Sequence, residues 1–207
     1  MWGIVEDNAI TKIINNPKAL VIGDTRHSRK IFELWSAEEL EAIGIYEVVF
    51  DNSNKKDEQY YINTNQSFNY ADGVVTASYG SATPKLLEDR NETNEDGSPM
   101  LDADGNQLVT KGLKTLKKEI IKGQASGLLA PTDWYIIKAT DVVEYSVPSA
   151  VSTFRADVRT RSNEMETAID NASDVDALAT LYAYVNTGTE ENPVYERPLG
   201  EFPTLEI

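Results

Sequence analysis

The strongest pattern in this sequence is the stretch from Pro148 to Ile169, PSAVSTFRADVRTRSNEMETAI. Its apolar residues recur at intervals of three, four and seven, which is the period of a helix with one buried face. The proline stands where such a helix begins, because its fixed φ suits the first turn. We therefore predict an amphipathic helix with the inward positions Val151, Phe154, Val158, Met165 and Ile169.

Helical spacing extends upstream of this stretch. Leu113, Leu116 and Ile120 predict the inward face of a preceding helix, whose end is expected to fray over the glycine-containing residues 123–127. Pro131-Thr132-Asp133 predicts a second helix start, since proline and an acidic residue both favour the first turn. That helix is expected to direct Trp134 into the core.

A last helix is predicted downstream of these elements. Ser173 and Asp176 resemble a capping box at its start, because a serine side chain and an acidic residue three positions on satisfy each other's backbone amides. Val175, Leu178 and Tyr182 supply its apolar positions, and Gly188 marks the limit of the helical region.

The first 80 residues have the composition of strands. Residues 45–50 are β-branched and aromatic, and Asp72-Gly73 separates two apolar runs as a tight hairpin turn does. Ser36 followed by Glu39 predicts one capped helical turn among these strands. Beyond residue 80 the chain becomes polar, with a second small hairpin predicted at Asp104-Gly105.

Together these patterns predict an α+β chain. A small antiparallel β-rich N-terminal domain occupies 1–80, and a linker with the small hairpin occupies 81–110. A helical C-terminal region follows at 111–186, and residues 187–207 form an extended tail, because three prolines forbid a regular helix there.

Composition limits the function. The 207 residues are 41% hydrophobic, enough for a packed core, and their net charge of −15 disfavours contact with nucleic acid or anionic membranes. Cysteine is absent, which excludes disulfides and thiolate chemistry. We find no signal peptide and no apolar run long enough for membrane insertion.

A search for catalytic or ligand-binding motifs indicates a protein that is not an enzyme. The single histidine, His27, lies among basic and polar residues that suggest a solvated loop, and no nucleophile motif accompanies it. Residues 123–127 lack the Gly-Lys-Ser/Thr ending of a phosphate loop, and residues 102–106 do not match the spacing of a calcium loop. We predict no catalytic residue, no cofactor and no metal, while an enzyme using only carboxylates stays an alternative.

Two groups of residues are candidates for partner binding. Lys111, Lys114 and Lys118 belong to a cluster of lysines on one predicted helix, which is either a solvated face or a docking face for an acidic partner. The tail carries apolar residues that cannot form a helix with its prolines, so we expect it to cover a surface, with a partner favoured over its own chain. These residues are Tyr195, Leu199, Phe202, Leu205 and Ile207.

The aromatic residues of the first 80 positions leave a further choice open. Strand aromatics usually lie in the core, but tyrosines also suit a partner-binding or glycan-binding surface. The residues concerned are Tyr46, Phe50, Tyr60, Tyr61, Phe68, Tyr70 and Tyr79.

The helical half resembles a known group of proteins. LLAPTDWYIIK at 128–138, Val147-Pro148 and FRADVR at 154–159 are similar to the carboxy-terminal region of tail-fibre assembly proteins and related proteins of tailed bacteriophages. In that family a leucine pair precedes Thr-Asp-Trp, and a proline-containing turn leads to an aromatic-Arg-x-x-(Val/Leu)-Arg helix. This chain departs from the pattern at Phe154, where tyrosine or Trp-x-x-Tyr is usual.

The resemblance implies a non-enzymatic structural or assembly protein of a phage tail or tail fibre. Its expected partners are other tail or tail-fibre proteins, or further copies of itself, in the virion tail after synthesis in the host cytoplasm. An assembly chaperone absent from the mature virion is one alternative, and a glycan-binding receptor module is another.

Overall fold

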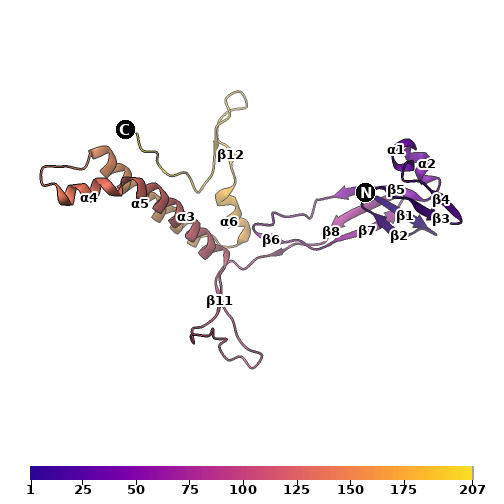
Figure 1. Cartoon of the computed structure of the whole chain (residues 1–207), viewed down its shortest axis with the longest axis horizontal. Coiled ribbons are helices and arrows are strands. Elements are labelled where there is room, and N and C mark those ends of the chain that lie inside the picture. The colour runs from indigo at the N-terminus through magenta and orange to yellow at the C-terminus, as the bar shows by residue number, and fades with distance from the viewer. Residues whose placement is uncertain (207) are drawn as a thin grey trace. The chain divides into compact units, whose positions relative to one another are not determined.

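The computed structural model describes residues 1–206, and its chain forms two compact units, Met1–Thr83 and a second that begins at Pro84. Most strands lie in the first unit, and the long helices all lie in the second (Figure 1). This distribution confirms the predicted α+β class.

A five-stranded sheet forms the first unit, with the strand order β2-β1-β5-β8-β7. Its strands are β1 (Trp2–Glu6), β2 (Ala9–Ile14), β5 (Ile45–Asp51), β7 (Gln66–Ala71) and β8 (Val74–Tyr79). The edge strands β2 and β7 approach each other, so the sheet is curled. The short strands β6 (Tyr61–Ile62) and β9 (Thr83–Pro84) pair separately.

The sequence predicted an antiparallel sheet, but one pair of strands in this sheet is parallel. Strands β5 and β8 run parallel, with Val48 opposite Val75, whereas the other pairings of this sheet are antiparallel. The difference arises because the β7–β8 hairpin joins the sheet through its second strand, which lies next to β5.

Both tight turns of the sheet use backbone conformations that suit their residues. Asp72 and Gly73 have φ values of 51° and 79°, which confirms the predicted hairpin. Asp7 and Asn8, with φ values of 49° and 61°, make an equivalent turn between β1 and β2. Two-residue turns with positive φ match the twist of paired strands, so these residues set the register.

Apolar side chains pack on both faces of the curled sheet. One cluster includes Ile14, Leu40 and Ile45, and α1 (Ile31–Leu34) and α2 (Ala37–Glu41) contribute to it. The other includes Val48, Val75 and Ala77. The capping box that begins α2 is confirmed, since the amides of Ser36 and Glu39 each donate to the other's side chain.

His27 lies on a strand, so the expectation of a loop was wrong. It ends β4 (Thr25–His27), which pairs with β3 (Leu20–Ile22), and its ring lies nearly perpendicular to that of Trp35 at a centroid distance of 5.6 Å. The contact with Trp35 gives the imidazole a packing role that its polar neighbours in the sequence do not indicate.

The second unit begins with a branched pair of hairpins. Strands β10 (Arg90–Asn91) and β11 (Val109–Thr110) form its base. The predicted turn at Asp104-Gly105 is confirmed, and the Asp102 carboxylate accepts the amides of Asp104 and Asn106. The residues that resembled a calcium loop therefore use their first carboxylate to close a turn.

Helix α3 (Leu113–Leu129) is anchored at its first turn by the segment before the hairpins. The Gly112 amide donates to Asp89 at 2.7 Å, and the Leu113 amide donates to the Leu86 carbonyl at 2.8 Å. A Cβ on Gly112 would lie 2.3 Å from the Glu88 carbonyl carbon, so only glycine permits this approach.

Helix α5 (Ser149–Asp170) packs along α3 as the central pair of this unit (Figure 1). The five predicted inward residues of α5 are all buried. On α3, Leu113 is buried as predicted, but Leu116 and Ile120 are 42% and 50% exposed. Ile121 and Ala125 are buried instead, so the predicted phase was wrong beyond the first turn. Residues 123–127 also continue the helix rather than fray.

A 3-10 turn, η1 (Ala130–Thr132), connects α3 to α4 (Asp133–Asp141), so a helix does start after Pro131 as predicted. Trp134, however, is 50% exposed, and no residue of α4 is buried. The expectation that Trp134 lies in the core was therefore wrong, because no other described element covers this helix.

The last helix, α6 (Val175–Tyr182), is capped by Asp174 rather than by Ser173. The Asp174 carboxylate accepts the amide of Ala177 at 2.7 Å. Beyond α6, β12 (Val185–Asn186) and β13 (Tyr195–Glu196) form a hairpin, and the chain then continues without regular structure.

Candidate functional site

The most organised polar site of the second unit lies where α3 ends. Pro131 turns the chain, and Thr132, 2% exposed, points inward and donates from its hydroxyl to the Leu129 carbonyl at 2.7 Å. This arrangement leaves lone pairs on the hydroxyl and the carbonyl that still accept a donor.

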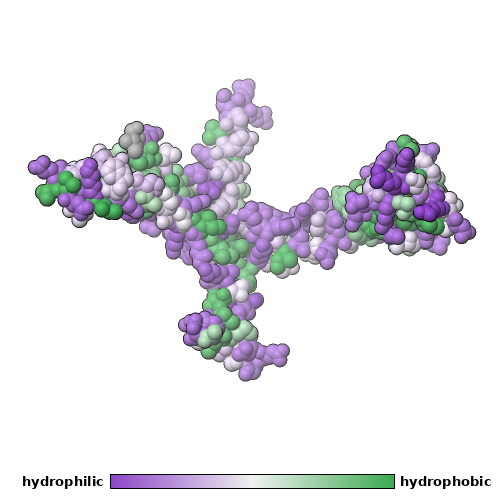
Figure 2. Space-filling model, viewed as in Figure 1, coloured by the Kyte–Doolittle hydropathy of each residue, from purple (hydrophilic) through white to green (hydrophobic). Residues whose placement is uncertain are grey.

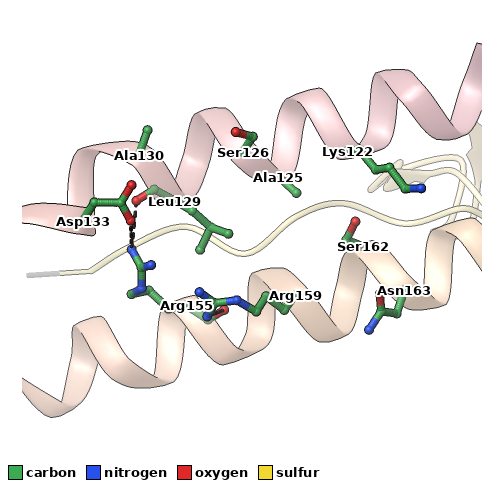
Figure 3. A pocket seen from close by; sticks show the side chains of 10 residues that line it. All are labelled: Lys122, Ala125, Ser126, Leu129, Ala130, Asp133, Arg155, Arg159, Ser162 and Asn163. Atoms are coloured by element: carbon green, nitrogen blue, oxygen red, sulfur yellow. Dashed lines mark hydrogen bonds and ion pairs between the residues drawn. The ribbon is translucent and has the colours of Figure 1, made fainter. Parts of the chain in front are cut away.

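Arg155 of α5 supplies that donor. Its guanidinium donates to the Leu129 carbonyl at 3.0 Å and to the Thr132 hydroxyl, and it pairs with the Asp133 carboxylate at 2.8 Å. Arg155 is only 8% exposed, so its charge is compensated inside the protein, as buried charges require. Figure 3 shows the contact between Arg155 and Asp133 across the space between the helices.

The polar site joins two stretches of the sequence, 132–134 and 154–159. Thr132 and Asp133 belong to Thr-Asp-Trp, and Arg155 belongs to Phe-Arg-Ala-Asp-Val-Arg. Phe154, next to Arg155, packs against Ala125 and Val158 in the core of the helical pair. Both patterns therefore fix the corner between α3 and α4, and they set the direction in which α4 leaves.

Helix α4 and the residues after it present an apolar surface, which we call the α4 surface. Green, apolar atoms gather at this end of the helical pair in Figure 2. The exposed residues are Trp134, Ile136, Ile137, Val142 and Val143.

Lys138 orders the aromatic part of the α4 surface. Its ammonium lies 4.3 Å from the ring centroid of Tyr145 and 5.7 Å from that of Trp134. The Trp134 ring also stacks on Tyr135 at 3.8 Å between centroids. Because these contacts restrict the rings, less entropy is lost when a partner covers them.

A groove of about 520 Å³ lies beside the polar site, between α3 and α5. Its lining includes Lys122 and Ser126 from α3, Asp133, and Arg155, Arg159 and Asn163 from α5. In Figure 3, Arg159 lies along the groove next to Arg155. The groove has a polar, cationic lining with apolar stretches at Ala125 and Leu129.

The three lysines predicted to bind a partner make ion pairs within the chain. Lys111 pairs with Glu119, Lys118 pairs with Asp170 at 2.6 Å, and Lys114 is 8% exposed beside Glu88. The placement of Lys114 on a docking face was therefore wrong, because its ammonium also donates to the Asp170 carbonyl and fixes α3 to α5. The hydrogen bond from Lys118 to Asp170 raises the pKa of Lys118.

The tail covers its own helices. Leu199 is 2% exposed, its amide donates to the Leu181 carbonyl at 2.9 Å, and its carbonyl accepts from Arg161 at 2.7 Å. Phe202 and Leu205 pack against the cluster that includes Phe154. The prediction that the tail covers a partner rather than its own chain was therefore wrong for Leu199, which is buried within this chain.

Tyr195 and Ile207 are the remaining apolar residues of the tail that were expected to cover a surface. Tyr195 is 64% exposed on β13, so its ring lies on the surface of the hairpin. Ile207 lies outside the described residues.

The aromatic residues of the first unit mostly pack inward. Tyr46, Phe68 and Tyr70 lie against the cluster around Val75, and Tyr60 is 5% exposed. Phe50 is 47% exposed. These positions favour a core role over a flat aromatic surface for glycan rings.

Among residues 1–206, no group of three or more histidine, cysteine, aspartate or glutamate side chains is arranged to hold a metal ion. None of the helices in this part of the chain combines the length and apolar character that a bilayer crossing requires.

No family model matches the chain, and comparisons with curated proteins and with solved structures found no similar protein.

Sequence reasoning missed the partners of Arg155 and the groove altogether. An arginine directly after a buried phenylalanine on an amphipathic helix indicates a cation that contacts a neighbouring element, since that position lies at the edge of the buried face. The contact with Thr132 has no local signal, because it joins residues 23 positions apart.

Proposed function

We propose that this chain is a non-enzymatic structural or assembly protein of a bacteriophage tail or tail fibre. It acts by protein–protein contact, and the α4 surface is the contact surface. The observation that carries the proposal is that a buried polar site fixes a helix whose own side chains are all at least partly exposed. The similarity of the Thr-Asp-Trp and Phe-Arg-Ala-Asp-Val-Arg patterns to phage tail-fibre assembly proteins supports the tail context.

The α4 surface has the composition of an interface centre. The buried centre of an interface is more apolar than its rim, aromatic residues are enriched there, and charged residues other than arginine are depleted. Trp134, Ile137 and Val143 are 50%, 61% and 99% exposed, and they follow one another along α4 and the segment after it. Burial of these three side chains would contribute several kcal/mol to association, at about 25 cal/mol per Å².

The proposal is tested by deleting the gene in its phage and counting complete tails by electron microscopy. The protein is also quantified by mass spectrometry in purified wild-type particles. Tail loss with the protein present at a fixed copy number supports a structural subunit, and tail loss with the protein absent from particles supports an assembly chaperone. Normal tails without the gene refute both forms of the proposal.

A further inference from the structure

The groove between α3 and α5 has a charge opposite to that of the chain. The whole chain carries 34 acidic residues against 19 lysines and arginines. The groove lining has three cations, Lys122, Arg155 and Arg159, and one acidic residue, Asp133. A local excess of positive charge attracts carboxylates, whereas most of the surface of this acidic chain repels them.

The three cations differ in how many partners they have. Arg155 is buried, and one nitrogen of its guanidinium, Nη1, already contacts Leu129, Thr132 and Asp133. Lys122 lies 3.3 Å from Glu166 and is 64% exposed, so water competes for its ammonium.

Arg159 is the cation with the most unused hydrogen-bonding capacity. It donates to the Arg155 carbonyl at 3.1 Å and makes no ion pair with any residue from 1 to 206. A guanidinium has five N–H donors, and most of those on Arg159 therefore face the groove or solvent.

We propose that this groove is a binding site for the carboxylate of an aspartate or glutamate side chain from a partner protein. Arg159 binds the carboxylate through two parallel N–H donors, and Lys122 adds a second positive charge. Arg155 stays with Thr132 and Asp133 and holds the wall of the groove in place.

The position of the groove favours a protein as the source of the carboxylate. Asp133 lines the groove and is also the first residue of α4. The groove and the α4 surface are therefore neighbours. A partner segment that covers the α4 surface with apolar side chains is expected to place an acidic side chain in the groove. The carboxylate site depends on the proposed function in one respect only, namely that its ligand belongs to a partner protein.

The experiment measures binding of a fluorescein-labelled hexaglutamate peptide to the full chain by fluorescence anisotropy. Arg159→Gln should weaken binding about tenfold, since one charge-assisted hydrogen-bonded pair is lost. Lys122→Gln should weaken it less, because Lys122 is shared with Glu166. Lys18→Gln, which removes an exposed charge from the first unit, is the matched control and should leave binding unchanged.

Three results would overturn the proposal. They are absence of binding to the unchanged protein, equal weakening by Lys18→Gln and Arg159→Gln, or inorganic phosphate binding in the groove as tightly as the peptide. A phage carrying Arg159→Gln that still builds tails, while the gene deletion does not, would reject the groove and leave the proposed function standing.

Discussion

Replacement of Arg155 by alanine tests the polar site that fixes α4. The change removes the donor to the Leu129 carbonyl and the Thr132 hydroxyl and leaves Asp133 without its cation. A hydrogen bond to a charged group contributes about 1.5–3 kcal/mol. The Asp133 side chain is 56% exposed, so solvent screens that ion pair to less than about 1 kcal/mol.

The expected loss of stability is about 2–4 kcal/mol. Thr132 continues to donate to Leu129 after the change, which keeps the loss below that of a fully orphaned buried group. Arg29→Ala is the matched control, because Arg29 and Glu33 form an exposed pair at 3.8 Å and its removal should cost less than about 0.5 kcal/mol.

The assay is urea unfolding followed by circular dichroism at 222 nm, which reports mainly the helices of the second unit, and by tryptophan fluorescence, which reports the first unit through Trp2 and Trp35. Arg155→Lys should lie between the wild type and Arg155→Ala, since lysine keeps the charge but not the fork of donors. A loss under about 1 kcal/mol for Arg155→Ala, or one equal to that of Arg29→Ala, would refute the role assigned to this site.

Three further predictions follow from the second unit. Gly112→Ala should destabilise the protein by about 1–3 kcal/mol in urea unfolding, because its Cβ meets the Glu88 backbone, and an unchanged midpoint would contradict this. Deletion of 190–207 should lower stability by about 4 kcal/mol, because Leu199 and the packed residues after it leave the core; an unaltered melting temperature would show that the tail is not packed. The hydrogen bond from the Ala177 amide lowers the pKa of Asp174 below its usual 3.8, so the cap is fully effective above that pH and is lost as the pH falls through the lower folded value. Asp174→Asn should therefore lose less stability than the wild type between about pH 5 and about pH 3, measured by thermal unfolding.

Local patterns in the sequence located the elements well, since their signals lie within a few residues. The spacing of apolar residues predicted α5 and its buried face, and Asp72-Gly73 predicted the hairpin between β7 and β8. The Ser36 capping box was also predicted, because both of its hydrogen bonds join residues three positions apart.

Errors arose where a position depends on distant parts of the chain. Leu116 and Trp134 were expected inside, but α5 and the tail pack on the other face of α3, and Trp134 lies on a helix with no buried residue. Lys114 was expected on the surface, yet Glu88 and the Asp170 carbonyl compensate its charge in a buried position. The parallel pairing of β5 with β8 likewise depends on how the hairpin docks, which alternation of residues does not encode.

We propose that the chain serves phage tail assembly through the α4 surface. The most direct test of this proposal is complementation of a phage gene deletion by Ile137→Asp, with Leu34→Asp as the control, since Leu34 is 74% exposed on α1 of the first unit. We predict that Ile137→Asp keeps the melting temperature of the wild type but yields few or no complete tails, whereas Leu34→Asp restores them. Full tail numbers with Ile137→Asp, counted in the same micrographs, would contradict the account.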